Sequence, residues 1–414
     1  MIKFRWEPEF KTTEIGEIPK DWETIRLAEV MTNIEKGKVP KKSPGVYPYL
    51  SVDYLRGNSN NAEFYGKGVG VFVTQNDILM IWDGVINAGE IFRGVKGLLS
   101  STMCRLIYDK TKIHRDYLYH TLKLFEPIIR EARRGTDDRH VDKSMFLSIK
   151  IPYPFLSEQS RIATVLSWFD DLIENKKRQN EILEKTAMAI FKSWFVDFEP
   201  FKEGEFVYNE ELDREVPKGW EVKAIGEVAE LESGGNAPQS EIYFENGKYP
   251  FIRVKHMSTG STVYSYDLIN DKAIERYRLK LYPEGVIFFQ KSGESLKKAR
   301  VNILPFDAYI VNHIAILQPK TQILREFLFH YMKILLFHIV RGESGTALPY
   351  INISTVKSKF IPIPPQPILE KFHSLVEPLF QKIILNQKQI MVLRKIRDAL
   401  LPQLIFGKLR VAEL

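Results

Sequence analysis

Two stretches of the chain carry apolar residues at alternating steps of three and four positions, and the first has no proline or glycine between Glu158 and Val196. Apolar residues spaced in this way lie on one face of a helix and form the seam of a coiled coil. The first seam comprises Ile162, Leu166, Phe169, Ile173, Leu183, Ala187, Ile190 and Trp194, with Lys176 and Asn180 at its polar steps. The second comprises Phe372, Val376, Leu379, Ile383, Ile390, Leu393, Leu400 and Leu404, with Asn386 and Arg397 at its polar steps.

The polar steps of the two seams have a structural explanation. Buried or half-buried polar residues at such positions usually fix the register and orientation of paired helices. Lys176 could extend its ammonium group to water while its methylenes stay on the seam. We therefore interpret both stripes as helix packing and not as part of a cofactor site.

The segments before the two helices have a different pattern. Short runs rich in Val, Ile, Tyr and Phe, such as 69–82 and 284–293, are punctuated by Gly, Asn and Pro. This pattern predicts strands and turns, with helix near 115–131 and 323–340.

Four short phrases recur in the same order in the two halves of the chain, at offsets that drift from 198 to 210 residues. The pairs are IPKDWET (18–24) with VPKGWEV (216–222), YPYLSV (47–52) with YPFIRV (249–254), RGT (134–136) with SGT (344–346), and IPYP (151–154) with IPIP (361–364). Two copies of one unit explain this order, and the period is too long for a solenoid. We predict an α+β fold with two tandem domains at 1–154 and 201–364, and long helices at 155–200 and 365–414.

Composition narrows the functional class. The chain has 414 residues, a net charge of +7 and a sequence pI of about 9.0. The basic surplus lies mostly in 31–150 and 229–360, whereas 155–200 is slightly acidic. This distribution is a mild indication of a polyanion partner. The single cysteine, Cys104, has no partner for a disulfide, and the sequence shows no signal peptide or membrane span, so we expect a cytoplasmic protein.

The order domain, helix, domain, helix favours antiparallel pairing of the helices, because parallel pairing would need a long return path within the second domain. Antiparallel pairing relates the two halves by a pseudo-two-fold axis. A helix of about 36–40 residues is roughly 55–60 Å long, and one turn of B-DNA is about 34–36 Å. Such a rod could hold two readers on one duplex, so we expect recognition of a split sequence whose half-sites differ.

The sequence lacks several catalytic patterns. It has no G-x-x-x-x-G-K-[ST] loop, no Asn/Asp-Pro-Pro-aromatic tetrapeptide and no H-x-x-x-H pair, and we find no convincing nuclease cluster of carboxylates and lysine. We therefore expect no catalysis and no metal site in this chain.

Several longer stretches resemble the DNA-specificity subunit of type I restriction–modification enzymes. The stretches are 16–30 (GEIPKDWETIRLAEV) and 216–238 (VPKGWEVKAIGEVAELESGGNAP) at the starts of the domains, 158–200 with its FKSWFVDFEP ending, and 393–411 (LRKIRDALLPQLIFGKLRV). The helix entries PYPFLSEQ and PPQPILEK depart from the family's usual Pro-Pro-Leu and acidic start.

The resemblance implies a non-catalytic subunit with two target-recognition domains that read a bipartite, asymmetric site on double-stranded DNA. It also implies two adenine-methylating modification subunits and two restriction–translocation subunits as partners. We expect no cofactor in this chain, with S-adenosylmethionine, ATP and Mg²⁺ used by those partners.

Candidate DNA contacts come from loops that combine basic, amide and acidic side chains. Arg can bind guanine through two hydrogen bonds, Asp can accept from cytosine, and Asn or Gln can pair with adenine. The candidates in the first domain are Lys38, Lys41, Lys42, Asp53, Tyr54, Arg56, Arg133, Arg134, Asp138, Arg139 and His140. Those in the second domain are Asn236, Gln239, Arg253, Lys255, His256, Lys291, Lys297, Lys298, Arg300, Thr346, Tyr350 and Asn352.

Other interpretations remain open. The stretch 133–140 could equally be a solvated turn with local salt bridges, and the shared Trp22 and Trp220 are better explained as packing anchors than as readers. The whole protein could instead be a stand-alone DNA-binding regulator or architectural protein, or a protein–protein scaffold with incidental basic charge.

Overall fold

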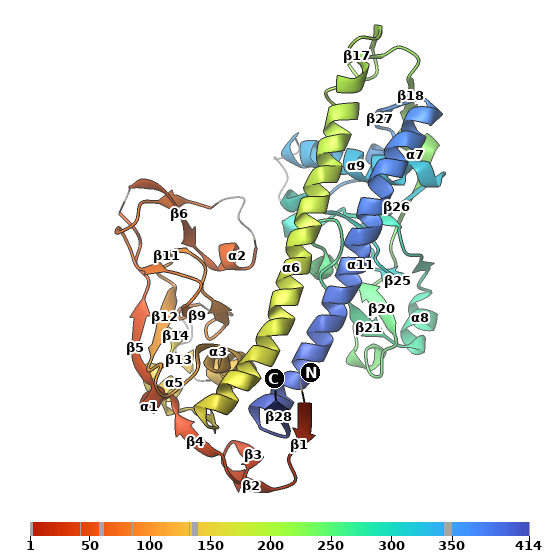
Figure 1. Cartoon of the computed structure of the whole chain (residues 1–414). Helices are drawn as coiled ribbons and strands as arrows, with labels where there is room; N and C mark the ends of the chain where they lie inside the picture. Colours follow the sequence, from red (N-terminus) through yellow and green to blue (C-terminus); the bar gives the residue numbers. More distant parts are fainter. Residues whose placement is uncertain are drawn as a thin grey trace. The chain divides into compact units, whose positions relative to one another are not determined.

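The computed structural model describes residues 3–41, 43–57, 62–84, 86–131, 133–134, 140–342 and 350–413. The chain forms two compact units: unit 1 is Met1–Asp171 with Arg394–Leu414, and unit 2 is Leu172–Leu393. Two helices, α6 (Leu156–Phe195) and α11 (Gln366–Ile405), each contribute residues to both units (Figure 1). This division cuts through the helices and not at their ends, so the domain ranges expected from the sequence stay a prediction.

Unit 1 contains two four-stranded sheets. The first has the order β10-β9-β12-β5 and is antiparallel, and the second has the order β7-β6-β11-β8, in which β6 and β11 are parallel. The strands of the first are β5 (Met31–Lys36), β9 (Ile78–Ile81), β10 (Ile91–Arg93) and β12 (Met103–Tyr108). Those of the second are β6 (Pro44–Leu50), β7 (Phe64–Tyr65), β8 (Phe72–Val73) and β11 (Gly97–Leu99).

Unit 2 repeats this topology. Its sheets have the orders β19-β26-β23-β24 and β21-β20-β25-β22, and β20 with β25 is again the parallel pair. The strands of the first are β19 (Ala229–Ser233), β23 (Ile287–Gln290), β24 (Val301–Ile303) and β26 (Ile314–Pro319). Those of the second are β20 (Tyr249–Ile252), β21 (Asp267–Ile269), β22 (Leu281–Tyr282) and β25 (Ala308–Ile310). Each strand of the two four-stranded sheets of unit 1 thus has a counterpart with the same neighbours in unit 2.

The smaller elements correspond only in part, because two of the four strand pairs of unit 1 have no counterpart among the described residues of unit 2. Those of unit 1 are β1 (Lys3–Trp6) paired with β28 (Leu409–Glu413), β2 (Phe10–Thr13) with β3 (Gly16–Pro19), β4 (Glu23–Arg26) with β15 (Lys150–Tyr153), β13 (Arg133–Arg134) with β14 (His140–Val141), and helices α1 (Leu27–Val30), α2 (Val52–Leu55), α3 (Arg115–Leu124), α4 (Glu126–Glu131) and α5 (Lys143–Ser148). Those of unit 2 are β16 (Phe206–Asn209) with β17 (Arg214–Pro217), β18 (Glu221–Ala224) with β27 (Phe360–Ile363), helices α7 (Ile225–Val228), α8 (Asp271–Tyr277), α9 (Arg325–Gly342) and α10 (Ile353–Lys357), and short 3-10 turns at Glu199–Phe201, Glu241–Tyr243, Val254–His256, Glu294–Lys298 and Gln322–Leu324.

Helices α3 and α9 occupy matching places and each carries a buried histidine. His120 is 3% exposed and His330 is 2% exposed. Burial lowers the pKa of His120 to about 4 and that of His330 to about 3, so both rings are neutral near pH 7. His120 Nε2 lies 3.3 Å from Arg93 Nη2, and Arg93 in turn binds Asp170 of α6 at 3.0 Å. These contacts fix α3 of unit 1 to the part of α6 that belongs to the same unit.

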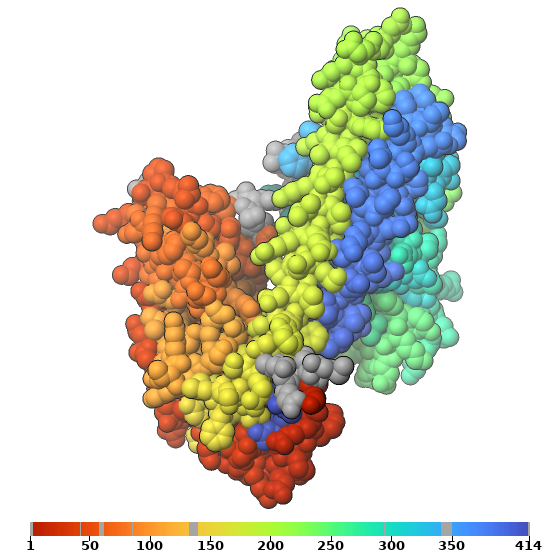
Figure 2. Space-filling model, viewed as in Figure 1, coloured from red at the N-terminus to blue at the C-terminus, as the bar shows by residue number. Residues whose placement is uncertain are grey.

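The apolar seam residues of the long helices are largely buried, as the spacing predicts: Ile162, Leu166, Phe372, Val376 and Ile383 are all fully buried. Within unit 2, Asn386 Nδ2 donates to Asn180 Oδ1 at 2.9 Å. Lys176, which is half-buried, donates from its Nζ to Gln389 Oε1 at 2.5 Å. In the space-filling view the surface of α6 lies against that of α11 (Figure 2). The polar steps of the seam therefore contact the facing helix.

The shared tryptophans are packing residues, but the two are packed differently. Trp22 of unit 1 is fully buried and donates from its Nε1 to Glu158 Oε2 at 3.1 Å. Arg410 of β28 stacks on the Trp22 ring and also binds Glu158, Glu7 and Asp21. This ion cluster joins the first and last strands of the chain to the start of α6. These hydrogen bonds to carboxylates raise the pKa of Arg410 above its ordinary value.

In unit 2 the counterpart of this junction is aromatic. Trp220 packs on Phe195, Phe198 and Phe201, with ring centres 5.9, 5.3 and 5.5 Å away. The same shared phrase is therefore anchored by charge in one unit and by aromatic packing in the other. Within the described ranges, none of the helices combines the length and apolar character that a membrane-crossing segment needs.

Replacing Arg410 with Ala tests the ion cluster. Glu158 is 3% exposed, so the variant leaves a buried carboxylate without its cation, which costs about 3–5 kcal/mol. We expect a clearly lower unfolding midpoint in thermal melts. Lys218→Ala removes an exposed ion pair with Glu205 and should change stability by less than about 1 kcal/mol. Equal effects of the two substitutions would contradict the proposed importance of the cluster.

Candidate nucleic-acid interface

In unit 2, several candidate loops meet at the turn formed by Val311, Asn312 and His313, here called the 311–313 turn. Asn312 N donates to Gly235 O at 2.7 Å, and Gly235 N donates to Ile310 O at 2.8 Å. A Cβ atom on the neighbouring Gly234 would lie 2.4 Å from two carbonyl oxygens of this region. Glycine is therefore required where the GGNAPQS loop passes the turn.

Candidate side chains gather around the 311–313 turn. Asn312 Nδ2 donates to Asn236 Oδ1 at 2.9 Å, and Ser292 Oγ lies 2.8 Å from His313 Nδ1. Ser292 also forms a backbone bridge with Tyr350, and Lys291 Nζ lies 5.5 Å from the centre of the Tyr350 ring. The structure thus brings Asn236, Lys291 and Tyr350 together from three loops that are far apart in the sequence.

Unit 1 has the same arrangement with different side chains. Gly37 approaches the backbone so closely that a Cβ atom there would lie 2.0 Å from Ser100 O. Asp83 N donates to Thr102 O at 3.0 Å, and Asp83 forms a backbone bridge with His140. Lys36 Nζ binds Asp83 Oδ2 at 2.8 Å. The bridge from Asp83 to His140 corresponds to that from Ser292 to Tyr350, so both units build one framework and carry different polar groups on it.

A second cluster in unit 2 follows β20, and it comprises Arg253, Lys255, His256, Asp267 and Arg300. Asp267 Oδ2 lies 3.1 Å from Arg253 Nε, and its Oδ1 accepts from Lys255 Nζ at 3.0 Å. Partial burial would raise the pKa of Asp267, but the hydrogen bond from Lys255 and the neighbouring cations hold it below its ordinary value. Asp267 is therefore a carboxylate at neutral pH, and three of the predicted contact residues surround it.

In the same cluster, two of the predicted DNA-contact residues, His256 and Arg300, have a supporting role. His256 is 3% exposed, and its Nδ1 accepts from Arg253 N at 3.0 Å. Burial lowers the pKa of His256, so the ring is mostly neutral and supports the turn from inside. Arg300 Nη1 donates to Val254 O at 3.1 Å. His256 and Arg300 thus support the segment that presents Arg253 and Lys255, and a direct base contact by His256 does not fit its burial.

The remaining candidates have varied surroundings. Arg56 forms an ion pair with Glu90. Asn352 caps α10 by accepting from Ser354 N at 3.1 Å, which gives it a structural role. Lys38, Lys41, Asp53, Gln239, Lys297 and Lys298 are exposed, and Tyr54 is half-buried in α2. Lys42, Asp138, Arg139 and Thr346 lie outside the described residues, and the side chains of Arg133 and Arg134 are likewise outside them.

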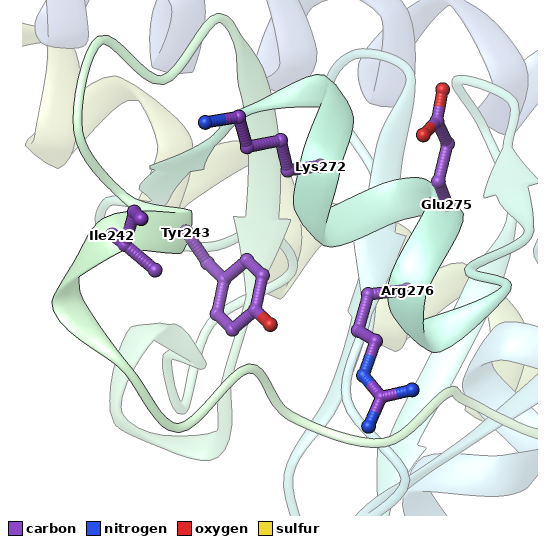
Figure 3. A pocket seen from close by; sticks show the side chains of 5 residues that line it. All are labelled: Ile242, Tyr243, Lys272, Glu275 and Arg276. Atoms are coloured by element: carbon purple, nitrogen blue, oxygen red, sulfur yellow. The ribbon is translucent and has the colours of Figure 1, made fainter.

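Sequence reasoning missed a shallow cavity of about 470 Å³ on unit 2. It is lined by Ile242, Tyr243, Lys272, Glu275 and Arg276, and Figure 3 shows the last three projecting from α8. The Tyr277 hydroxyl at the end of α8 accepts from Gln239 N at 3.3 Å, so the cavity borders the GGNAPQS loop. Lys272 and Arg276 are exposed cations suited to a phosphate contact.

The described residues contain no group of three or more His, Cys, Asp or Glu side chains arranged to hold a metal ion. Cys104 is buried, and burial raises its thiol pKa above the ordinary value.

Comparison with known proteins decides the family. A family model described as the type I restriction modification DNA specificity domain matches residues 19–185 and again residues 217–395. The chain belongs to this family. The double match confirms that the protein contains two copies of one domain, and the resemblance inferred from the repeated phrases is confirmed with it.

Relatives in the specificity family match over the whole chain. The MjaIX specificity subunit of a type I restriction enzyme from Methanocaldococcus jannaschii is 48% identical over 434 residues, covering 100% of this chain and 99% of the relative. The MjaVIII specificity subunit from the same organism is 31% identical, with 100% and 99% covered. These relatives are named as specificity subunits, and this chain is accordingly a specificity subunit and not an enzyme.

A solved structure supports the fold. The crystal structure of a type I restriction–modification S subunit from M. genitalium superposes with a TM-score of 0.56 at 19% sequence identity, covering 96% of this chain and 99% of that one. At this identity the likeness concerns the fold alone. It agrees with the repeated sheets and long helices of this specificity subunit.

The close backbone approaches at the two frameworks can be tested by adding one methyl group. Gly37→Ala and Gly234→Ala each place a Cβ atom 2.0–2.4 Å from carbonyl oxygens. We expect each to cost about 1–3 kcal/mol of stability, as overpacking usually does, and to weaken DNA binding. The measurements are thermal melts and DNA titrations. Gly70→Ala is the control, because its nearest neighbour would be 3.7 Å away; an equally large effect there would argue against the steric explanation.

Proposed function

We propose that this specificity subunit recognises a bipartite, asymmetric DNA site, with one half-site read by the domain of each unit. The observation that carries the proposal is the repeated framework with unlike polar groups. Unit 1 carries Lys36, Asp83 and His140 where unit 2 carries Ser233, Ser292 and Tyr350. A shared backbone with different donors and acceptors is what reading two different sequences requires, because base edges are distinguished by hydrogen-bond pattern.

Charge supports DNA as the partner. The chain has a net charge of +7, and its exposed cations include Lys38, Lys41, Lys297 and Lys298 in loops of the two domains. Such groups release counterions from phosphates and position a protein on the duplex without reading sequence. The reading itself would fall to the polar groups of the two frameworks and of the cluster around Asp267.

We further propose that α6 and α11 form an antiparallel coiled coil that serves as the spacer between the readers. Asp170 binds Arg397 in unit 1, and Lys176 binds Gln389 and Asn180 binds Asn386 in unit 2. Residues with higher numbers on α6 therefore contact residues with lower numbers on α11, as in an antiparallel pair. Forty residues of helix are about 60 Å long, which exceeds one turn of B-DNA at about 34–36 Å.

The repeat supplies further support for a pseudo-two-fold axis across the helix pair. Arg178 and Lys388 are separated by the repeat offset of 210 residues, so they occupy equivalent positions in the two copies. The contacts of Lys176 and Asn180 flank Arg178, and those of Asn386 and Gln389 flank Lys388. An axis through this point would exchange the two helices.

The long helices also offer a surface for partner subunits. Several apolar side chains on their unit 2 segments are exposed, and these are Leu172, Ile182, Leu375, Leu385 and Val392. Ile182 and Val392 are equivalent positions of the repeat and are 64% and 55% exposed. We propose that two identical modification subunits dock on this surface. In the cytoplasm two restriction subunits would then join the assembly, with S-adenosylmethionine, ATP and Mg²⁺ used by the partners.

The assembly proposal predicts that DNA binding depends on partners. Alone, the chain should bind DNA weakly and lose affinity steeply with salt. With its modification subunits it should prefer its split site over other DNA by at least about 10³-fold. Competition titrations at several salt concentrations measure both. Tight specific binding without partners would favour a stand-alone regulator, and absence of salt-dependent binding in every combination would favour a protein scaffold.

The docking surface predicts the effect of new charges on the helices. Ile182→Asp combined with Val392→Asp should weaken assembly with the modification subunits at least about ten-fold, because each Asp must be desolvated at an apolar contact. Analytical ultracentrifugation of the mixed subunits measures this. Val207→Asp is the control, since Val207 is 51% exposed but lies on β16. Unchanged assembly of the double variant would exclude this surface.

A further inference from the structure

The cluster around Asp267 points to one base pair of the second half-site. We propose that Arg253 reads a guanine there and that Asp267 is the positioning residue that aims it, with the Phe244 ring packed against the guanidinium. This inference rests on the proposed function, in which unit 2 reads one half of a split DNA site. It adds a base identity and two residues that the sequence did not suggest.

The first support is the way Arg253 is held. It directly follows β20 and precedes the 3-10 turn Val254–His256. Its Nε lies 3.1 Å from Asp267 Oδ2, and its guanidinium carbon lies 4.8 Å from the centre of the Phe244 ring. A planar cation placed against an aromatic ring and beside a carboxylate loses most of its rotational freedom. Arg253 is therefore pre-organised before any DNA arrives.

The terminal nitrogens of the Arg253 guanidinium remain available for a base contact. Its side chain is 31% exposed, and the contact with Asp267 is made through Nε. No described residue accepts a hydrogen bond from its two terminal Nη nitrogens. Two parallel N–H groups held in one plane match the O6 and N7 acceptors of guanine in the major groove, which is the commonest specific arginine contact.

The third support is the rigidity of the turn beneath the arginine. His256 Nδ1 accepts from Arg253 N at 3.0 Å, and His256 Nε2 lies 3.3 Å from Asp267 Oδ1. Arg300 Nη1 donates to Val254 O at 3.1 Å. Both the backbone and the carboxylate that hold Arg253 are thus fixed by other side chains, as a precise base contact requires.

Lys255 and Arg253 suit different parts of the DNA. Lys255 is 59% exposed and binds the same carboxylate at 3.0 Å, which suits it to a nearby phosphate as a point charge. Arg253, less exposed and fork-shaped, suits a base edge. In unit 1 the position equivalent to Arg253 is Ser51, as the phrases YPYLSV (47–52) and YPFIRV (249–254) show. The arginine is therefore particular to unit 2, as expected if each copy reads its own sequence.

The test uses the complex of this chain with its modification subunits and a set of duplexes in which each base pair of the second half-site is replaced in turn. Methylation rates are compared for the wild-type protein, Arg253→Lys, Arg253→Ala and Asp267→Asn. We expect both arginine variants to lose at least about five-fold discrimination at one G·C position. Asp267→Asn should lose part of the discrimination at the same position, and all other positions should keep their preference.

The matched control is Asp271→Asn, which removes one exposed carboxylate from the same domain, where Asp271 accepts from Tyr249 Oη at 2.9 Å. It should leave every base preference unchanged. Arg253→Lys keeps the positive charge and removes the two parallel N–H donors. It therefore tests whether Arg253 reads a base even if Asp267→Asn does not fold. Melting curves and assembly with the modification subunits establish which variants are folded.

Two results would overturn the inference. A uniform loss of rate on all duplexes would make Arg253 a phosphate contact, and an unchanged preference at every position would remove it from the interface. The proposed function fails separately, and visibly, if the wild-type complex itself shows no preference among the duplexes.

Discussion

The register of the two long helices depends on a pair of buried amides. Asn386 is fully buried and Asn180 is 7% exposed, and the two bind each other at 2.9 Å. Sliding one helix along the other by a turn would separate them and leave each amide unsatisfied among apolar side chains, at about 1–3 kcal/mol apiece. The same slide would separate Lys176 from Gln389. A purely apolar seam would tolerate several registers, whereas these polar steps specify one.

Duplication explains how one chain can carry two copies of one backbone framework with unlike polar groups. The strand orders of the sheets agree strand for strand, including the parallel pairs β6–β11 and β20–β25. What differs is the chemistry mounted on that framework and the way each copy is anchored. Trp22 is held by Arg410 and Glu158, whereas Trp220 is packed among phenylalanines. The two copies share one backbone arrangement, and the side chains on its loops differ between them.

The long helices and the duplication could be predicted from the sequence because their signals are periodic or repeated. The seam positions Ile162 and Phe372 are indeed buried. The candidate interface was harder, because its geometry depends on contacts between distant positions. Asp267 holds Arg253 from another strand, His313 contacts Ser292 beside two paired strands, and Asp83 bridges to His140. No local pattern marks such partners, and none marked His256 as a buried support.

The pairing of β1 with β28 has a consequence for how the protein is made. Unit 2 is one continuous stretch of chain, whereas unit 1 is assembled from the first 171 residues and the last 21. Arg410, which holds Trp22 and Glu158, is synthesised only after the whole of unit 2. Unit 1, whose N-terminal part is synthesised first, is therefore completed only after unit 2. A nascent chain interrupted before Arg410 carries an unfinished N-terminal half whose buried Glu158 lacks its cation.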